Sequence, residues 1–287
     1  MSQTALNRSK TRVYRTLERS SLFKAAVQAR KNDHCNLVRE RLATRNERAL
    51  LATLRNGRDF CWLENPEDTE PLVTVAIPTY NRPDTVVRAI NSAIHQTYRN
   101  LEILVIGDAT DSQSVELIRA IDDPRVRFVN LSRQGVYPTT AGIRGMVAGT
   151  KPMNVALDLA SGAWIANCDD DDELLPHHVT TLLAAAKQNH IEFIYSKSEV
   201  VDYTRDLSGH EPVEIIGSEP LQIRSITRGS VLYSAALTFM RYDVESWRVG
   251  EPADWNLWKR MRMAGVRIGF LDEITYRYNW GESPHQR

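Results

Sequence analysis

Hydrophobic positions in the middle of the chain alternate between short β-branched runs and stretches with helical spacing. The runs 72–78, 101–106 and 126–130 are typical of strands buried in a parallel sheet. Between them, the segments 86–94 and 115–121 carry apolar residues three and four positions apart, which indicates amphipathic helices. This order of strand, helix, strand, helix, strand predicts an α/β domain built on a parallel, doubly wound sheet.

The pattern continues towards the C-terminus, although less regularly. The apolar run 231–240 fits either a strand or a buried helix, because its periodicity does not decide between them. The other expected elements are a strand over 162–168, a helix whose first turn holds Pro176, strands over 191–195 and 274–280, a loop-rich connection over 202–220 and a helix opening over 250–261.

Residues 1–65 differ from the rest of the chain in charge. They hold 14 Lys and Arg against 6 Asp and Glu, an excess of 8, whereas the whole chain has a formal net charge of zero. Apolar residues at helical spacing predict one long or two shorter amphipathic helices here. The basic helices either pack on the main domain with a solvated face, or attach to an anionic membrane surface or a partner. A polar, proline-bounded linker, 66–71, precedes the main domain.

Composition narrows the classes of protein. With 287 residues, 42% hydrophobic and 25% charged, the chain is globular, and zero net charge argues against a general nucleic-acid binder. We find no apolar run near the ~20 residues of a membrane span and no secretory signal, so we expect a cytoplasmic protein. Cys35, Cys61 and Cys168 are scattered and match neither a zinc nor a disulfide spacing.

Polar residues gather where the predicted strands end. Tyr80 and Asn81 follow the first strand, Asp108 follows the second, and Asp169–Asp172 follow the strand over 162–168. The carboxyl ends of parallel strands meet in one crevice, which is where α/β proteins bind ligands. The first strand is followed by neither a GxGxxG nor a P-loop sequence, so the dinucleotide and P-loop classes are excluded.

The four consecutive carboxylates repel one another. A close pair costs about 1 kcal/mol in water and about 4 kcal/mol at an effective dielectric near 20. A divalent cation such as manganese or magnesium would remove this cost, and a solvated acidic loop is the alternative. With a cation, the crevice suits a nucleoside diphosphate: Tyr80 stacks on the base and Asp108 binds base or ribose. Alternatively, Tyr80 covers the sheet edge and Asp108 caps the next helix.

These residues resemble family 2 glycosyltransferases with the GT-A fold. The resemblance rests on the strand followed by Pro-Thr-Tyr-Asn-Arg, and on the run from Asn154 into the acidic loop, which is similar to the family's DxD motif. It implies that Pro78 and Tyr80, with Asn81, line the nucleobase pocket. It further implies that Asp108 contacts base or ribose, that Asp170 lies near the ribose, and that Asp171 and Asp169 hold the metal.

The segment 250–261 resembles the family's acidic motif ahead of Trp-x-Leu-Trp, which implies that Asp254 is the catalytic base, with Glu251 in reserve. Asp254 would otherwise cap its helix. The implied reaction is a single in-line displacement with inversion at the sugar. The resemblance also implies that residues 72–200 form the nucleotide-sugar-binding half of the domain and that residues 201–287 form the acceptor-binding half. His285 stands where some relatives supply a histidine to the metal.

Some features depart from the family pattern and leave alternatives open. Gly107 and Ala253 stand where acidic residues are common, which keeps open a non-catalytic sugar-nucleotide-binding or scaffold protein of the same fold. A nucleotidyltransferase is a further alternative. The glycine-rich stretch 135–153 is either a lid or a surface insertion, and its Arg144 and Lys151 are candidates for the donor phosphates. The expected acceptor is a glycan, a lipid-linked glycan or a small molecule, with peripheral contact at the inner membrane face through the basic helices.

Overall fold

The computed structural model describes residues 34–56, 70–203, 212–223 and 225–281. The predicted helical segment before residue 34, most of the predicted linker and His285 lie outside these ranges.

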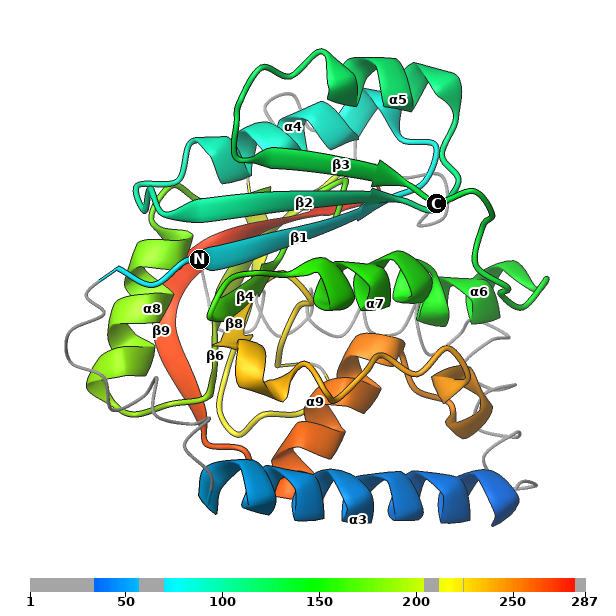
Figure 1. The fold of residues 1–287 in the computed structure, drawn as a ribbon, viewed down its shortest axis with the longest axis vertical. Helices are drawn as coiled ribbons and strands as arrows, with labels where there is room; N and C mark the ends of the chain where they lie inside the picture. Colours follow the sequence, from blue (N-terminus) through cyan, green and yellow to red (C-terminus); the bar gives the residue numbers. More distant parts are fainter. Residues whose placement is uncertain (1–33, 57–69, 204–211, 224, 282–287) are drawn as a thin grey trace.

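One nine-stranded sheet forms the centre of the molecule (Figure 1). Its strand order is β3-β2-β1-β4-β8-β6-β9-β5, with β7 beside β6. The first four of these strands are parallel, as predicted, whereas β8 runs antiparallel between β4 and β6. The strands are β1 (Val73–Thr79), β2 (Leu101–Gly107), β3 (Val126–Asn130), β4 (Trp164–Asn167), β5 (Glu173–Leu174), β6 (Phe193–Asp202), β7 (Pro212–Ile216), β8 (Val231–Ser234) and β9 (Ile268–Trp280).

Helices cover both faces of the sheet. In Figure 1, α4 and α5 lie on one side of β1–β3, while α6 and α7 lie on the other. The predicted boundary between residues 200 and 201 falls inside β6, so the two proposed halves share one sheet. The helices are α3 (His34–Asn56), α4 (Pro83–Ile94), α5 (Ser112–Arg119), α6 (Ala141–Val147), α7 (Thr150–Leu159), α8 (His178–Gln188), the 3-10 turns η2 (Ala235–Leu237) and η3 (Ser246–Val249), and α9 (Ala253–Ala264).

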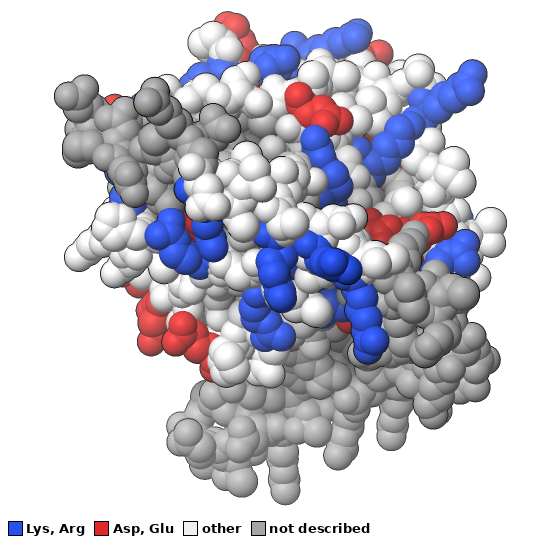
Figure 2. Space-filling view, turned by 60° about the horizontal axis from the view of Figure 1, so that its bottom comes forward, with Lys and Arg blue, Asp and Glu red and all other residues white. Residues whose placement is uncertain are grey.

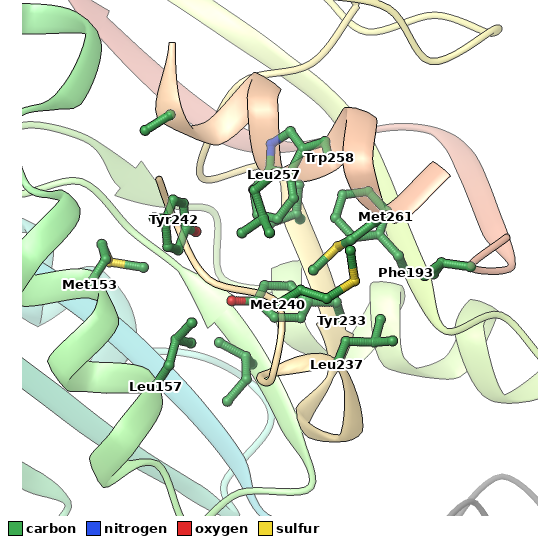
Figure 3. Close-up of a cluster of buried hydrophobic side chains, with 14 of the residues drawn as sticks. Met153, Leu157, Phe193, Tyr233, Leu237, Met240, Tyr242, Leu257, Trp258 and Met261 are labelled. Atoms are coloured by element: carbon green, nitrogen blue, oxygen red, sulfur yellow. The ribbon is translucent and has the colours of Figure 1, made fainter. Parts of the chain in front are cut away.

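The alternation of side chains along β1 separates two apolar layers. Val73, Val75 and Ile77 pack with α4 and α8, whereas Ala76 faces the layer that contains α7 and α9. Figure 3 shows this second layer, in which Trp258 of α9 lies against Phe193, with ring centroids 4.9 Å apart. The inward stripe of α9 therefore fixes this helix against the C-terminal part of the sheet.

Some predicted elements need correction. The glycine-rich stretch 135–153 contains α6 and the start of α7, and the two helices meet at Gly149, whose φ of +77° suits glycine. The connection expected over 202–220 includes β7, an edge strand whose Ile215 is half exposed. Pro176 precedes the cap of α8 and lies outside the helix. The run 231–240 is strand β8 followed by η2.

Helix α3 packs across α9 (Figure 1), so residues 34–56 are part of the main body of the protein. Leu51 of α3 is buried, and Arg55 donates two hydrogen bonds, of 3.1 and 2.6 Å, to the fully buried carboxylate of Glu192. The opposite side of α3 exposes Arg41, Leu42 and Arg45. Among the described helices, none is long and apolar enough to cross a membrane.

We predict that Leu51→Ala lowers the free energy of unfolding by about 2–5 kcal/mol, because the substitution leaves a cavity between α3 and the main body. Its neighbour Leu50 is 43% exposed, and Leu50→Ala should change the stability by no more than about 0.5 kcal/mol. Urea unfolding of the two variants measures both values. Equal effects would show that α3 does not dock as described.

Candidate active site

The carboxyl ends of β1, β2 and β4 bring the predicted loops together. The backbone N–H of Asp108 donates to Thr79 O at 2.8 Å, and that of Cys168 donates to Ala76 O at 3.0 Å. The N–H of Tyr80 reaches a carboxylate oxygen of Asp170 at 3.3 Å. The loop after β1 and the acidic loop, Asp169–Asp172, therefore lie side by side at this edge of the sheet.

Tyr80 and Asn81, the two candidate residues after β1, differ in their surroundings. The side chain of Tyr80 is 37% exposed, which leaves its ring accessible. Asn81 has a φ of +51°, which asparagine tolerates better than most residues. Its side-chain oxygen accepts from the N–H of Asp111 at 2.8 Å, and its own N–H donates to Thr110 Oγ1 at 2.7 Å. Asn81 thus ties the loop after β1 to the loop after β2.

Asp108 is buried and binds a third segment of the chain, which contains Gly135 and Tyr137. One carboxylate oxygen accepts from the N–H of Gly135 at 2.8 Å, and the other accepts from the hydroxyl of Tyr137, also at 2.8 Å. Burial, followed by this bond to Asp108, raises the pKa of Tyr137, so the phenol stays a neutral donor. The cap of α5 is Asp111, which accepts from Ser114 N at 2.8 Å, so the alternative of Asp108 as helix cap is wrong.

Within the acidic loop, Asp172 has a structural environment. Its buried carboxylate accepts from the hydroxyl of Tyr276 at 2.7 Å and from the N–H of Asn279 at 2.8 Å. Asn279 also donates through its side chain to Asp171 O at 2.8 Å. These bonds fasten the acidic loop to β9. Tyr276 itself is fully buried against the loop.

Two arginines neutralise the carboxylates that face the crevice. Arg228 pairs with Asp169 at 2.7 Å, and Arg82 pairs with Asp171 at 2.9 Å. Sequence reasoning did not identify either arginine. Arg82 directly follows Tyr80 and Asn81, and this position could have identified it as a site residue. Arg228 lies in a stretch without any motif.

Charge in the loop nevertheless remains costly. Burial raises the pKa of Asp169 to about 6; Arg228 opposes this rise, while Asp171 and Asp254 add to it. Burial and then repulsion from Asp171 raise the pKa of Asp170 to about 7. Ionising these carboxylates is therefore costly even with the two arginines present, and a bound cation would lower that cost.

The donor set fits a cation that is shared with a ligand. Carboxylate oxygens are the ligands that magnesium and manganese prefer, and magnesium is usually held by one or two carboxylates together with substrate phosphates. Among the described residues, no group of three His, Cys, Asp or Glu side chains could hold an ion. Asp169 and Asp171 carry the type of oxygen donor that such a cation takes.

Asp254 approaches this crevice from the C-terminal part of the chain. It is half-buried in the first turn of α9, as predicted, where negative charge is favourable. Its charge contributes to raising the pKa of Asp169, so the two carboxylates lie within electrostatic reach of each other. The structure thus brings together three loops and one helix terminus that are far apart in sequence.

The reserve candidate, Glu251, is engaged elsewhere. Its buried carboxylate accepts from Lys259 Nζ at 2.6 Å and from Asn256 Nδ2 at 3.1 Å. The carboxylate of Glu251 is thus engaged with side chains of α9.

The two basic candidates in the stretch 135–153 brace the chain around them. Arg144 donates to the carbonyls of Pro138 and Thr139, at 3.1 and 3.3 Å. Lys151 donates to Arg133 O at 2.6 Å. Pro78 lies on the inner side of this region, facing Gly149 at the start of α7.

Known proteins resemble this chain in sequence and in fold. It is 37% identical over 102 residues to the succinoglycan biosynthesis protein ExoO of Rhizobium meliloti (strain 1021), which covers 36% of this chain and 26% of that protein. It is 32% identical over 98 residues to the Escherichia coli UDP-Glc:alpha-D-GlcNAc-diphosphoundecaprenol beta-1,3-glucosyltransferase WfaP, covering 34% of each. The structure of S. aureus TarS 1-349 in complex with UDP superimposes with a TM-score of 0.55 at 18% identity, covering 72% of this chain and 60% of that one.

These matches differ in what they establish. The likeness to TarS confirms the predicted GT-A fold. The aligned segments make up about a third or less of the two curated relatives. The family model described as glycosyl transferase family 2 matches residues 74–140 and 150–246, more than half of the chain and the loops that build the crevice. The chain belongs to glycosyl transferase family 2.

Proposed function

We propose that this protein is an inverting glycosyltransferase that moves a sugar from a nucleoside-diphosphate sugar to an acceptor hydroxyl, with a divalent cation and with Asp254 as general base. The observation that carries the proposal is the convergence of Asp108, the acidic loop and Asp254 on one crevice at the carboxyl ends of parallel strands. TarS, which shares the fold, has been solved with UDP.

The nucleoside part of the donor lies between the loops after β1 and β2. The exposed ring of Tyr80 stacks on the base, with Pro78 and Asn81 forming the adjoining wall. Asp108 accepts hydrogen bonds from the base or ribose directly, or positions the backbone of Gly135 and the ring of Tyr137 against them. Asp170, which is fixed by Tyr80 N, lies near the ribose.

Asp169 and Asp171 would hold manganese or magnesium together with the diphosphate. When bound, the cation neutralises the charge that builds on the departing diphosphate. Arg82 and Arg228 balance these carboxylates in the structure, and a cation held there would take over part of that role.

The transfer is a single displacement. The acceptor oxygen forms a bond to the anomeric carbon as the bond to the diphosphate oxygen breaks, and the nucleoside diphosphate leaves with that electron pair. The hydroxyl proton passes to Asp254, a contribution typically worth about 10²–10⁴ in rate. Because one displacement occurs, the anomeric configuration inverts.

The packing at Gly107 weakens the non-catalytic alternative. A Cβ at this position would lie 2.5 Å from Asn130 Oδ1, which accepts from Thr110 N at 2.9 Å. A larger residue here would displace the Asn130 side chain from its hydrogen bonds to Thr110, so glycine suits the local packing. Ala253 precedes Asp254 in the first turn of α9 and leaves the base in place.

The first experiment is calorimetric titration of UDP, GDP and dTDP, each with and without manganese. We expect metal-dependent binding of one nucleotide, and Asp171→Ala should abolish the metal dependence because it removes a ligand. Asp158→Ala, a surface carboxylate that pairs with Arg241, is the control and should bind like wild type. If wild type binds none of the three, the proposal is wrong for these donor classes.

Asp254→Asn tests the base. We expect donor hydrolysis and transfer to fall about 10²-fold or more, while the affinity for nucleoside diphosphate stays within about twofold. Glu245→Gln, an exposed acid in a surface ion pair with Arg248, serves as the matched control. Turnover that survives in Asp254→Asn would remove this residue from the mechanism and bring Glu251 back.

We further propose that the acceptor is carried by a membrane and that α3 lies against an anionic surface. Basic side chains gather on the face that carries α3 (Figure 2). Leu42, flanked by Arg41 and near Arg45, is 54% exposed on this helix, which combines apolar and basic contact as interfacial helices do. WfaP, one of the relatives, is named for a diphosphoundecaprenol-linked acceptor.

Sedimentation with vesicles tests this contact. The protein should bind vesicles containing phosphatidylglycerol at low salt, and binding should weaken at high salt. Arg41→Gln should reduce the affinity about fivefold, since each basic residue near an anionic surface contributes about 1 kcal/mol. Arg99→Gln, which removes one exposed charge before β2, should have little effect. Binding that ignores vesicle charge would contradict the proposal.

A further inference from the structure

We infer that Arg228 binds the diphosphate of the donor, as a cationic residue of the crevice distinct from the metal-binding pair. This inference rests on the proposed function and names one more residue of the same site. It follows from how the backbone of Arg228 is fixed, what surrounds its guanidinium and which of its donors are engaged.

The chain around Arg228 is held at several points. The side chain of Asn167, at the end of β4, donates to Arg228 O at 3.3 Å and to the hydroxyl of Tyr242 at 3.0 Å. Thr227 shares a 2.6 Å hydroxyl hydrogen bond with Ser198 of β6. The backbone of Arg228 is therefore anchored to two strands of the sheet.

Gly229 shows how closely this turn approaches the rest of the site. A Cβ at Gly229 would lie only 2.0 Å from the ring of Tyr276, whose hydroxyl donates to Asp172. The turn that presents Arg228 thus packs on the same tyrosine that fastens the acidic loop. This arrangement directs a long basic side chain into the crevice from a fixed base.

The guanidinium lies at the start of α7. Its Nη2 and Nη1 atoms are 3.2 and 3.5 Å from where a Cβ of Gly149 would be, and Gly149 caps the N-terminus of this ten-residue helix. On its other side, Nη2 pairs with Asp169 at 2.7 Å. A helix N-terminus and an arginine are both positive, so together they suit this corner to the phosphate of a ligand.

One donor of Arg228 remains unused. Its Nε atom is buried and has no hydrogen-bond partner among the described residues. Leaving a buried charged donor unsatisfied is unfavourable, so Asp169 does not satisfy Arg228 completely. The Arg228 side chain is 19% exposed, which leaves its guanidinium open to a phosphate oxygen. Because Arg228 already contacts Asp169, a diphosphate that shares a cation with Asp169 lies beside the guanidinium.

A purely structural arginine that only neutralises Asp169 is the alternative. The two roles differ in what Asp169→Asn does to the effect of Arg228. If Arg228 only balances the carboxylate, removing the carboxylate makes Arg228 dispensable. If Arg228 binds phosphate, its removal still weakens diphosphate binding when residue 169 is neutral.

The experiment compares UDP with UMP by calorimetry in the presence of manganese, or the matching pair of another base if wild type prefers it. The variants are Arg228→Gln, Arg228→Lys, Asp169→Asn, and Asp169→Asn combined with Arg228→Gln. Arg241→Gln is the control, because Arg241 pairs with Asp158 at the other end of α7, at 2.6 Å. Thermal unfolding of each variant checks that it is folded.

We expect Arg228→Gln to weaken UDP binding at least about tenfold and UMP binding much less, since a hydrogen-bonded charge contributes about 1.5–3 kcal/mol. Arg228→Lys should recover part of the loss, and Arg241→Gln should match wild type. In the Asp169→Asn background, adding Arg228→Gln should still lower the affinity for UDP at least about tenfold. The affinity for UMP should not fall to this extent.

Two failures are distinguishable. If wild type binds UDP with manganese but the double variant binds it as well as Asp169→Asn does, the inference about Arg228 is wrong and the proposed function stands. If wild type binds no nucleoside diphosphate, the proposed function itself fails. Should Arg228→Gln not fold, Arg228→Lys and the double variant decide the question.

Discussion

The structure depends on how four consecutive carboxylates are accommodated at the end of β4. Water cannot solvate them fully, because three of the four are buried. Each carboxylate therefore requires a partner from another part of the chain. Those partners are Arg228 for Asp169, the Tyr80 backbone for Asp170, Arg82 for Asp171, and Tyr276 with Asn279 for Asp172.

This requirement separates the roles of the four acids. Asp172 receives only neutral donors from β9 in these contacts, and it anchors the loop. Asp169 and Asp171 instead pair with arginines, whose planar guanidinium matches carboxylate and phosphate alike. The two arginines therefore balance the carboxylates in this structure, which carries no ligand.

The sequence predicted the first half of the fold closely, since β1 to β3 and their helices follow simple local patterns. It also located Asp108, the acidic loop and Asp254, which sit at strand ends or a helix start. It did not predict Arg228, Tyr276 or the contact of Asp108 with Tyr137. These residues act through long-range packing, and β9 reaches the acidic loop across more than a hundred positions, which no local periodicity encodes. The α6–α7 region was misread because glycine suggests a loop, whereas here Gly149 joins two helices.

The position of the proposed base depends on α3, a segment that the sequence analysis placed outside the main domain. Helix α9 carries Asp254 in its first turn and packs its inner face on the sheet, while α3 covers its other side. A chain of polar contacts runs between these helices: Glu47 pairs with Arg260, Arg260 donates to Asn256, Asn256 donates to Glu251, and Lys259 completes the ion pair with Glu251. Breaking a buried pair at one end leaves an uncompensated charge inside the protein. Residues 34–56 thus help to fix the helix whose first turn carries Asp254, the proposed base.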